Sequence, residues 1–185
     1  MRTHLKSALL SLALFSAAQA ASAGEWQFLP VQGSGYKADV VLSLTNGTME
    51  PNGTGSAGYV GAELAFNCLL LAPPTGTIRT KLSYGSFDHA GIKLSTLELN
   101  PRWMVNVTPA LSLGAGPGLG MVSTEVAGKT KHLTAAQIGA DLDYRMDHVN
   151  LGLTLRRQAT RSADIGGGLS RASNTLLEAK VGYAF

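Results

Sequence analysis

The chain has 185 residues, of which 45% are hydrophobic, 15% are charged and 22 are glycine. Globular proteins usually carry about 25% charged residues and about 7% glycine, so this chain is poor in charge and rich in glycine. Such a composition excludes a disordered charged tail and a coiled coil. The formal net charge is +3 and no block of basic residues interrupts the chain, so we expect no nucleic-acid partner.

The first residues have the three parts of a secretory signal peptide. Arg2 and Lys6 form a basic start, residues 7–18 form a short apolar run, and small residues offer cleavage sites at 18–20 and 21–23. The apolar run is too short to anchor the chain, because a spanning helix needs about 20 residues. We therefore expect three parts: a signal peptide at 1–23, an N-terminal lead-in at 24–36 and one domain at 37–185.

Apolar and polar residues alternate through most of that domain. In 149–156, for example, the odd positions hold Val or Leu, and the even positions hold Asn, Gly, Thr and Arg. The same pattern predicts eight strands, at 39–44, 59–68, 78–85, 97–105, 111–121, 137–146, 149–156 and 177–185. We expect most of them to be about nine to thirteen residues long, which suits a strand that crosses a membrane.

The connections alternate in length. Short turns are expected at 73–76, 106–110 and 147–148, and longer polar loops at 45–56, 86–91, 127–132 and 159–173. Within the first loop, Asn46-Gly47-Thr48 and Asn52-Gly53-Thr54 are expected to form turns. Short turns at one end and longer loops at the other are typical of a bacterial outer-membrane barrel.

Two prolines and a glycine stripe interrupt the predicted strands. Proline cannot donate a hydrogen bond to a sheet, so we expect Pro101 and Pro117 each at a bulge or near a strand end. A second feature is the alternating glycines of 114–120, which we expect to make room for large neighbours such as Arg102 or Arg145.

The chain ends in Gly182-Tyr183-Ala184-Phe185, an alternating segment with a terminal aromatic residue. Together with the signal peptide and the eight alternating segments, this ending resembles the OmpA/OmpX-like family of small outer-membrane β-barrel proteins. The resemblance implies an all-β fold, an eight-stranded antiparallel up-and-down transmembrane barrel in the outer membrane of a Gram-negative cell envelope. It also implies that Tyr183 and Phe185 are an assembly signal for the barrel-assembly machinery. The expected surroundings are lipid and lipopolysaccharide, around a monomer.

In such a barrel the apolar face of each strand meets lipid and the polar face points into the lumen. Eight strands leave only enough room for side chains, so charges in the lumen must be paired. Five acidic and six basic residues fall on the polar face, and this balance favours a plug over a pore, which usually displays one sign. We expect an ion-pair network of Glu63, Arg79, Lys81, Glu98, Arg102, Asp141, Asp143, Arg145, Arg156, Glu178 and Lys180.

A group of aromatic residues falls near the strand ends beside the short turns. Aromatic side chains favour the boundary between membrane and water, where a ring is half buried. The sequence therefore predicts a periplasmic girdle of Phe66, Trp103, Tyr144, Tyr183 and Phe185.

These features predict a structural or surface-interaction protein with no catalytic residues, metal or cofactor. Two alternatives stay open. One is an enzyme that modifies lipid A or lipopolysaccharide, although no spacing supports a catalytic set drawn from Asp88, His89 and His132 with Ser86, Ser123 or Ser162. The other is a narrow transporter of small solutes, similar to the OmpW family, for which a lateral opening beside Pro101 and Pro117 would be needed.

Overall fold

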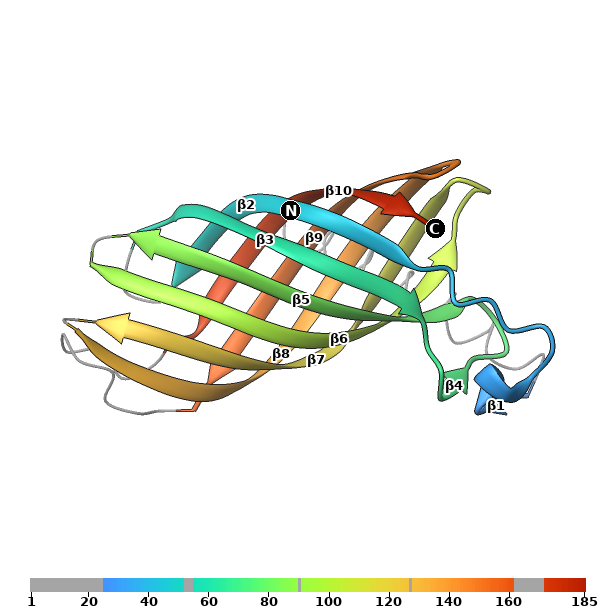
Figure 1. Ribbon diagram of the computed structural model, residues 1–185, viewed down its shortest axis with the longest axis horizontal. Coiled ribbons are helices and arrows are strands. Elements are labelled where there is room, and N and C mark those ends of the chain that lie inside the picture. The colour runs from blue at the N-terminus through green and yellow to red at the C-terminus, as the bar shows by residue number, and fades with distance from the viewer. Residues whose placement is uncertain (1–24, 52–54, 90, 127, 162–171) are drawn as a thin grey trace, which may run out of the picture.

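The computed structural model describes residues 25–51, 55–89, 91–126, 128–161 and 172–185. Within them, eight antiparallel strands close into a barrel in the order β10-β2-β3-β5-β6-β7-β8-β9, which confirms the predicted fold class (Figure 1). The barrel strands are β2 (Val41–Pro51), β3 (Ala57–Asn67), β5 (Thr77–His89), β6 (Ile92–Asn106), β7 (Leu111–Val126), β8 (Lys129–Met146), β9 (Val149–Thr160) and β10 (Asn174–Ala184). The expected signal peptide lies outside the described residues.

The inner and outer faces of the barrel are those that the alternation predicts. On β9, the outward Leu153 and Leu155 are more than half exposed, whereas the inward Thr154 and Arg156 are buried. A soluble barrel has the opposite arrangement, so the exposed apolar face is the one that meets lipid. No helix among the described residues is long and apolar enough to cross a membrane.

The strands extend further than predicted at the end away from the C-terminus. We call it the extracellular end, because the longest connection, between β9 and β10, joins the strands there. The expected loops at 45–56, 86–91 and 127–132 are largely wrong, since β2 runs to Pro51, β5 to His89, and β8 begins at Lys129. Asn46-Gly47-Thr48 is consequently not a turn. These residues pair with β3 on one side and β10 on the other, and pairing on both sides overrides a local turn preference. Asn52-Gly53-Thr54 lies outside the described residues.

The two prolines lie at neither a bulge nor a strand end, so that prediction is wrong. Leu99 pairs with Leu119 and Trp103 with Ala115 in one unbroken register, which sets Pro101 opposite Pro117 in the middle of the β6–β7 seam. The ladder between these two strands is interrupted at that level. The backbone N–H groups that the two prolines lack are therefore missing at the same level of one seam, and not at two different seams.

The glycines of β7 also differ from expectation in what they accommodate. A Cβ at Gly114 would meet the sulfur of Met104, and a Cβ at Gly118 would meet the side chain of Asn100. The side chain of Arg102 instead packs against Gly139 on β8, where a Cβ would meet its guanidinium.

A small ribbon lies outside the barrel at the periplasmic end (Figure 1). It pairs β1 (Gln27–Phe28) with β4 (Leu71–Ala72), and a 3-10 turn, η1 (Pro30–Gln32), follows β1. The expected tight turn at 73–76 is thus the last part of a longer connection between β3 and β5 that contains β4.

Candidate functional site

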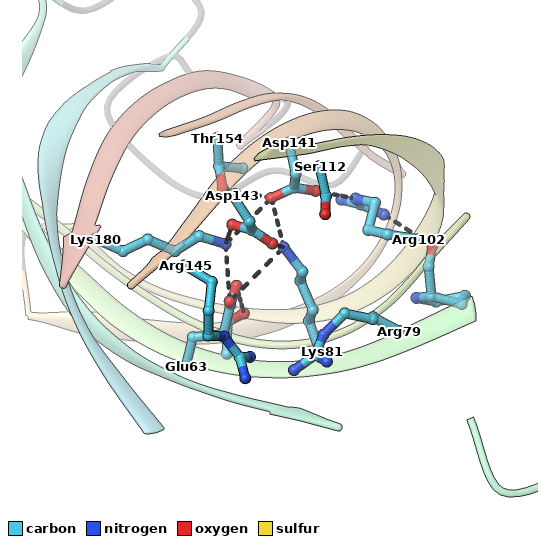
Figure 2. A network of polar contacts seen from close by, with 12 residues as sticks. Glu63, Arg79, Lys81, Arg102, Ser112, Asp141, Asp143, Arg145, Thr154 and Lys180 are labelled. Atoms are coloured by element: carbon cyan, nitrogen blue, oxygen red, sulfur yellow. Dashed lines mark hydrogen bonds and ion pairs between the residues drawn. The ribbon is translucent and has the colours of Figure 1, made fainter. Parts of the chain in front are cut away.

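The centre of the lumen holds two lysines among three carboxylates (Figure 2). Lys180 Nζ lies 2.9 Å from Glu63 Oε1 and 3.3 Å from an oxygen of each of Asp141 and Asp143. Lys81 Nζ lies 2.9 Å from Asp141 and 3.1 Å from Asp143. These residues come from β3, β5, β8 and β10, so the cluster joins strands across the barrel.

Arg102 supplies a third cation to this cluster and also contacts the barrel wall. Its Nε donates to Asp141 Oδ2 at 2.8 Å. Its Nη1 lies within hydrogen-bond distance of the carbonyl oxygens of Pro101, Gly116 and Pro117, at 3.2, 3.0 and 2.8 Å. Only 1% of Arg102 is exposed. The guanidinium therefore donates to carbonyls beside the break in the β6–β7 ladder.

A second polar layer lies nearer the extracellular end, around the ion pair of Glu98 and Arg156. Neutral side chains complete it. Glu98 Oε2 accepts hydrogen bonds of 3.1 Å from both Asn100 and Gln137. A chain of amide hydrogen bonds continues from Gln137 to Gln158 and Asn174, and Asn174 Oδ1 accepts from Arg156 at 3.2 Å. Both charged side chains of this layer are hydrogen-bonded, as burial of a charge requires, and only Arg156 Nε finds no partner among the described residues of the layer.

Above that layer the lumen becomes apolar. Met49, Tyr59, Phe87, Val122 and Leu176 are almost fully buried in one cluster near the extracellular ends of their strands. Tyr59 is the polar exception, and its hydroxyl lies 3.3 Å from that of Thr96. The interior thus changes along its length from ion pairs to close-packed apolar side chains.

The periplasmic mouth has an ion-pair triad that the sequence analysis missed. Asp39 lies just before β2 and pairs with Arg145 at 2.7 Å and with Arg79, whose Nη2 also donates to the Asp39 carbonyl at 2.9 Å. Burial raises the pKa of Asp39, but the hydrogen bonds and charges of the two arginines outweigh it and lower the pKa below its ordinary value. A cavity of about 260 Å³ opens beside the triad.

The predicted lumen residues thus fall into separate groups. Arg79 and Arg145 lie at the mouth, apart from the central cluster. Glu178 is buried on the inner face. The alternation already placed Asp39 on the same face as Ser43, so the first residue of that pattern was the available clue to the triad.

The predicted girdle residues lie on the outer face near the periplasmic ends of their strands. The Tyr183 ring contacts Phe185 edge-on at 5.2 Å and stacks on His148 at 5.3 Å. Trp103 contacts Trp26 at 6.5 Å, and its indole nitrogen donates to the Thr75 carbonyl at 2.9 Å.

Of the residues considered for catalysis, the structure brings two together. Ser123 Oγ lies 2.7 Å from His132 Nδ1, on the outer face of β7 and β8. Within the described residues, no carboxylate is hydrogen-bonded to the second nitrogen of His132. Asp88 lies opposite Lys93 and His89 contacts Phe87, while Ser162 lies outside the described residues. No group of three or more His, Cys, Asp or Glu in the described part of the chain could hold a metal ion.

No protein-family model and no curated protein matches the chain. Among solved structures, it is similar to Ail, the attachment invasion locus protein of Yersinia pestis, with a TM-score of 0.54 and 11% identity over 80% of this chain and 97% of Ail. It is also similar to Neisserial surface protein A, with a TM-score of 0.52 and 15% identity over 79% of this chain and 96% of that one. The chain has the fold of the small OmpA/OmpX-like outer-membrane barrels. At such low identity the likeness concerns the fold alone, so the function of this barrel has to be argued from its own lumen and surface.

Proposed function

We propose that this protein is a non-conducting, non-catalytic barrel of the outer membrane that acts through its outer and extracellular surfaces. The observation that carries the proposal is the order of side chains in the lumen, where the central lysine cluster, the Glu98–Arg156 layer and the apolar cluster follow one another along the axis. Asp39 balances the charge, since it adds a sixth carboxylate to the six cations of the inner face. A charge-balanced, hydrogen-bonded interior gives an ion no continuous lining of one sign.

The extracellular rim is the surface on which we expect contacts. Its outer face changes from apolar to polar where Ser86 lies opposite Ser95 and Ser95 opposite Ser123. Beyond this row, Asp88, Lys93 and Glu125 line a groove of about 360 Å³. Ail is named for attachment and invasion, and the Neisserial protein as a surface protein. We expect the rim of this protein to have a similar surface role and to contact lipopolysaccharide or a surface partner.

Assembly completes the proposal. After removal of residues 1–23, the final strand with Tyr183 and Phe185 is recognised by the barrel-assembly machinery, and the aromatic girdle positions the monomer at the periplasmic boundary. The ring contacts between Tyr183, Phe185 and His148 support the second role, because they hold these side chains on the outer face.

Liposome swelling tests the closed lumen. Vesicles that contain the purified protein are diluted into an isotonic pentose solution, with a general porin as the positive control. We expect the protein to give the swelling rate of empty vesicles. Swelling at a rate that grows with the amount of protein would contradict the proposal.

A second function is favoured by one observation, the hydrogen bond between Ser123 and His132 near the extracellular boundary. A serine beside a histidine is the minimal arrangement for acyl transfer. Lipid A mass spectra of cells with wild-type protein, with Ser123→Ala and with no protein test it. Our proposal predicts three identical acylation patterns, and a change that depends on Ser123 would establish the enzyme instead.

A further inference from the structure

The periplasmic ribbon exposes a concentration of apolar side chains. Phe28 is 79% exposed and Leu70 is 64% exposed, and Leu71, the residue after Leu70, pairs with Phe28. Backbone pairing holds them together, because the Leu29 amide donates to the Leu70 carbonyl at 2.9 Å. Trp26, Leu29, Val31 and Leu69 are also exposed. The ribbon is therefore ordered by its backbone, while its side chains are left uncovered by the barrel.

The ribbon also lacks the charged residues that a water-exposed surface normally carries. Apart from Glu25, residues 25–36 and 68–76 contain no Asp, Glu, Lys or Arg. Single exposed apolar residues are common, but a contiguous group without charges marks a surface that something else covers.

The ribbon is continuous with the lipid-facing wall of the barrel. Trp26 lies against Trp103, which is on the outer face of β6, at a ring distance of 6.5 Å. Trp103 in turn is held by its hydrogen bond to Thr75, in the segment that follows β4. Figure 1 shows β1 and β4 projecting beside the periplasmic ends of the strands. The apolar side chains of the ribbon thus extend the lipid-facing surface past the ends of the strands.

We propose that this ribbon is a membrane foot, which lies in the interfacial region of the periplasmic leaflet with phospholipid covering its apolar side chains. Tryptophan prefers that region because an indole has an apolar body and a polar N–H. The absence of charge in the two segments removes the main cost of such insertion. The proposal rests on the placement of the barrel in a membrane, and the following experiment separates the two.

The test uses fluorescence of the full mature chain in phosphatidylcholine vesicles. The chain has two tryptophans, Trp26 just before β1 and Trp103 on β6 beside it, so a Trp26→Phe, Trp103→Phe background is free of tryptophan. Phe28→Trp then places one reporter on the foot. Leu44→Trp on the outer face of β2 is the lipid control, and Asp88→Trp at the extracellular rim is the water control. Each is measured with lipids brominated near the headgroup end of the acyl chain, and with iodide in the buffer.

We expect brominated lipid to quench Phe28→Trp by at least half as much as it quenches Leu44→Trp, and iodide to quench it several-fold less than Asp88→Trp. Quenching by iodide without quenching by brominated lipid would overturn the foot. The foot would also be overturned if the emission of Phe28→Trp shifted with protein concentration and was not quenched by brominated lipid. Such a result would indicate that a second copy or another protein covers this surface. If brominated lipid does not quench Leu44→Trp, the placement of the barrel in a membrane is contradicted, and the proposal of the membrane foot is contradicted with it.

A second variant keeps the test independent of the new tryptophan. With Trp26 as the only tryptophan, Phe28→Ser with Leu70→Ser removes the most exposed apolar side chains without touching the barrel. We expect quenching of Trp26 by brominated lipid to fall at least twofold while the circular dichroism spectrum is unchanged. An unchanged quenching would contradict the proposal.

Discussion

Pro101 and Pro117 lie opposite each other across the β6–β7 seam, and Arg102 donates to the carbonyl oxygens of both. Neither proline can donate to the other strand, so their carbonyls would lack partners in a wall that faces lipid. One buried guanidinium supplies the missing donors from inside. This contact closes the place at which a lateral opening would otherwise be expected, and it argues against transport through the wall.

Replacing Arg102 tests that relationship. Arg102→Met keeps an unbranched apolar stem but removes the guanidinium, which leaves buried carbonyls without donors, each at a cost of about 1–3 kcal/mol. We expect the free energy of unfolding in lipid, measured by urea titration, to fall by about 3 kcal/mol. In a Pro101→Ala, Pro117→Ala background the backbone supplies its own donors, and the same substitution should cost clearly less. Equal costs in both backgrounds would show that Arg102 does not replace the ladder bonds.

Removing a cation from the central cluster should be equally damaging. Lys180→Met leaves Glu63, Asp141 and Asp143 with fewer partners, and breaking a buried ion pair costs about 3–5 kcal/mol. We expect a loss of stability in that range, again by urea titration. Adding Glu63→Gln should recover part of the loss, since it removes one of the uncompensated charges. If Lys180→Met left the free energy of unfolding unchanged, the cluster would be hydrated and the lumen open.

The triad at the mouth predicts a pH dependence. The pKa of Asp39 is lowered in the folded protein, so its contribution to stability is present above the pKa of the unfolded chain, about 3.9, and is lost as the pH falls through the lower folded value. We expect the difference in unfolding free energy between wild type and Asp39→Asn to be constant at neutral pH and to vanish under strongly acid conditions. Asp147→Asn, on a nearby periplasmic turn, is the control. A difference that persists unchanged at the lowest pH would contradict the role of the carboxylate charge.

The C-terminal aromatic residue predicts an effect on assembly. Phe185→Ser should reduce the amount of folded barrel in the outer membrane several-fold, because the final strand loses its terminal ring. Phe66→Ser, at another position of the girdle, is the matched control and should reduce it much less. Membrane fractionation with quantitative blotting measures both, and equal effects would show that Phe185 acts only as a girdle residue.

How far the sequence predicts this structure differs from feature to feature. Arg156 and Leu155 were assigned to the correct faces, because one buried face and one lipid face impose strict alternation. The extracellular loops were predicted too long. Polar residues such as Ser86 and Asp88 suggest a loop locally, yet pairing with β6 keeps them in a strand that extends past the apolar belt. Local composition does not report such pairing.

Contacts between distant segments could not be predicted from the sequence. The pairing of β1 with β4 joins segments more than forty residues apart and follows from no local pattern. The meeting of Pro101 with Pro117 depends on register, which alternation fixes only to the nearest pair of residues. The groups around Arg102 and around Asp39 likewise depend on which strands are neighbours and at what height each charge lies.

Single-channel recording tests the central claim of a closed lumen most directly. Purified protein is inserted into a planar bilayer in about 1 M salt, where the Debye length is only about 3 Å, with an established porin as the control. We predict that bilayers that contain the protein show no stable conductance steps. We also predict that a Glu98→Ala, Arg156→Ala variant conducts more often than wild type, since it removes the ion pair of the second layer. Reproducible steps of uniform size from the wild-type protein would contradict the account.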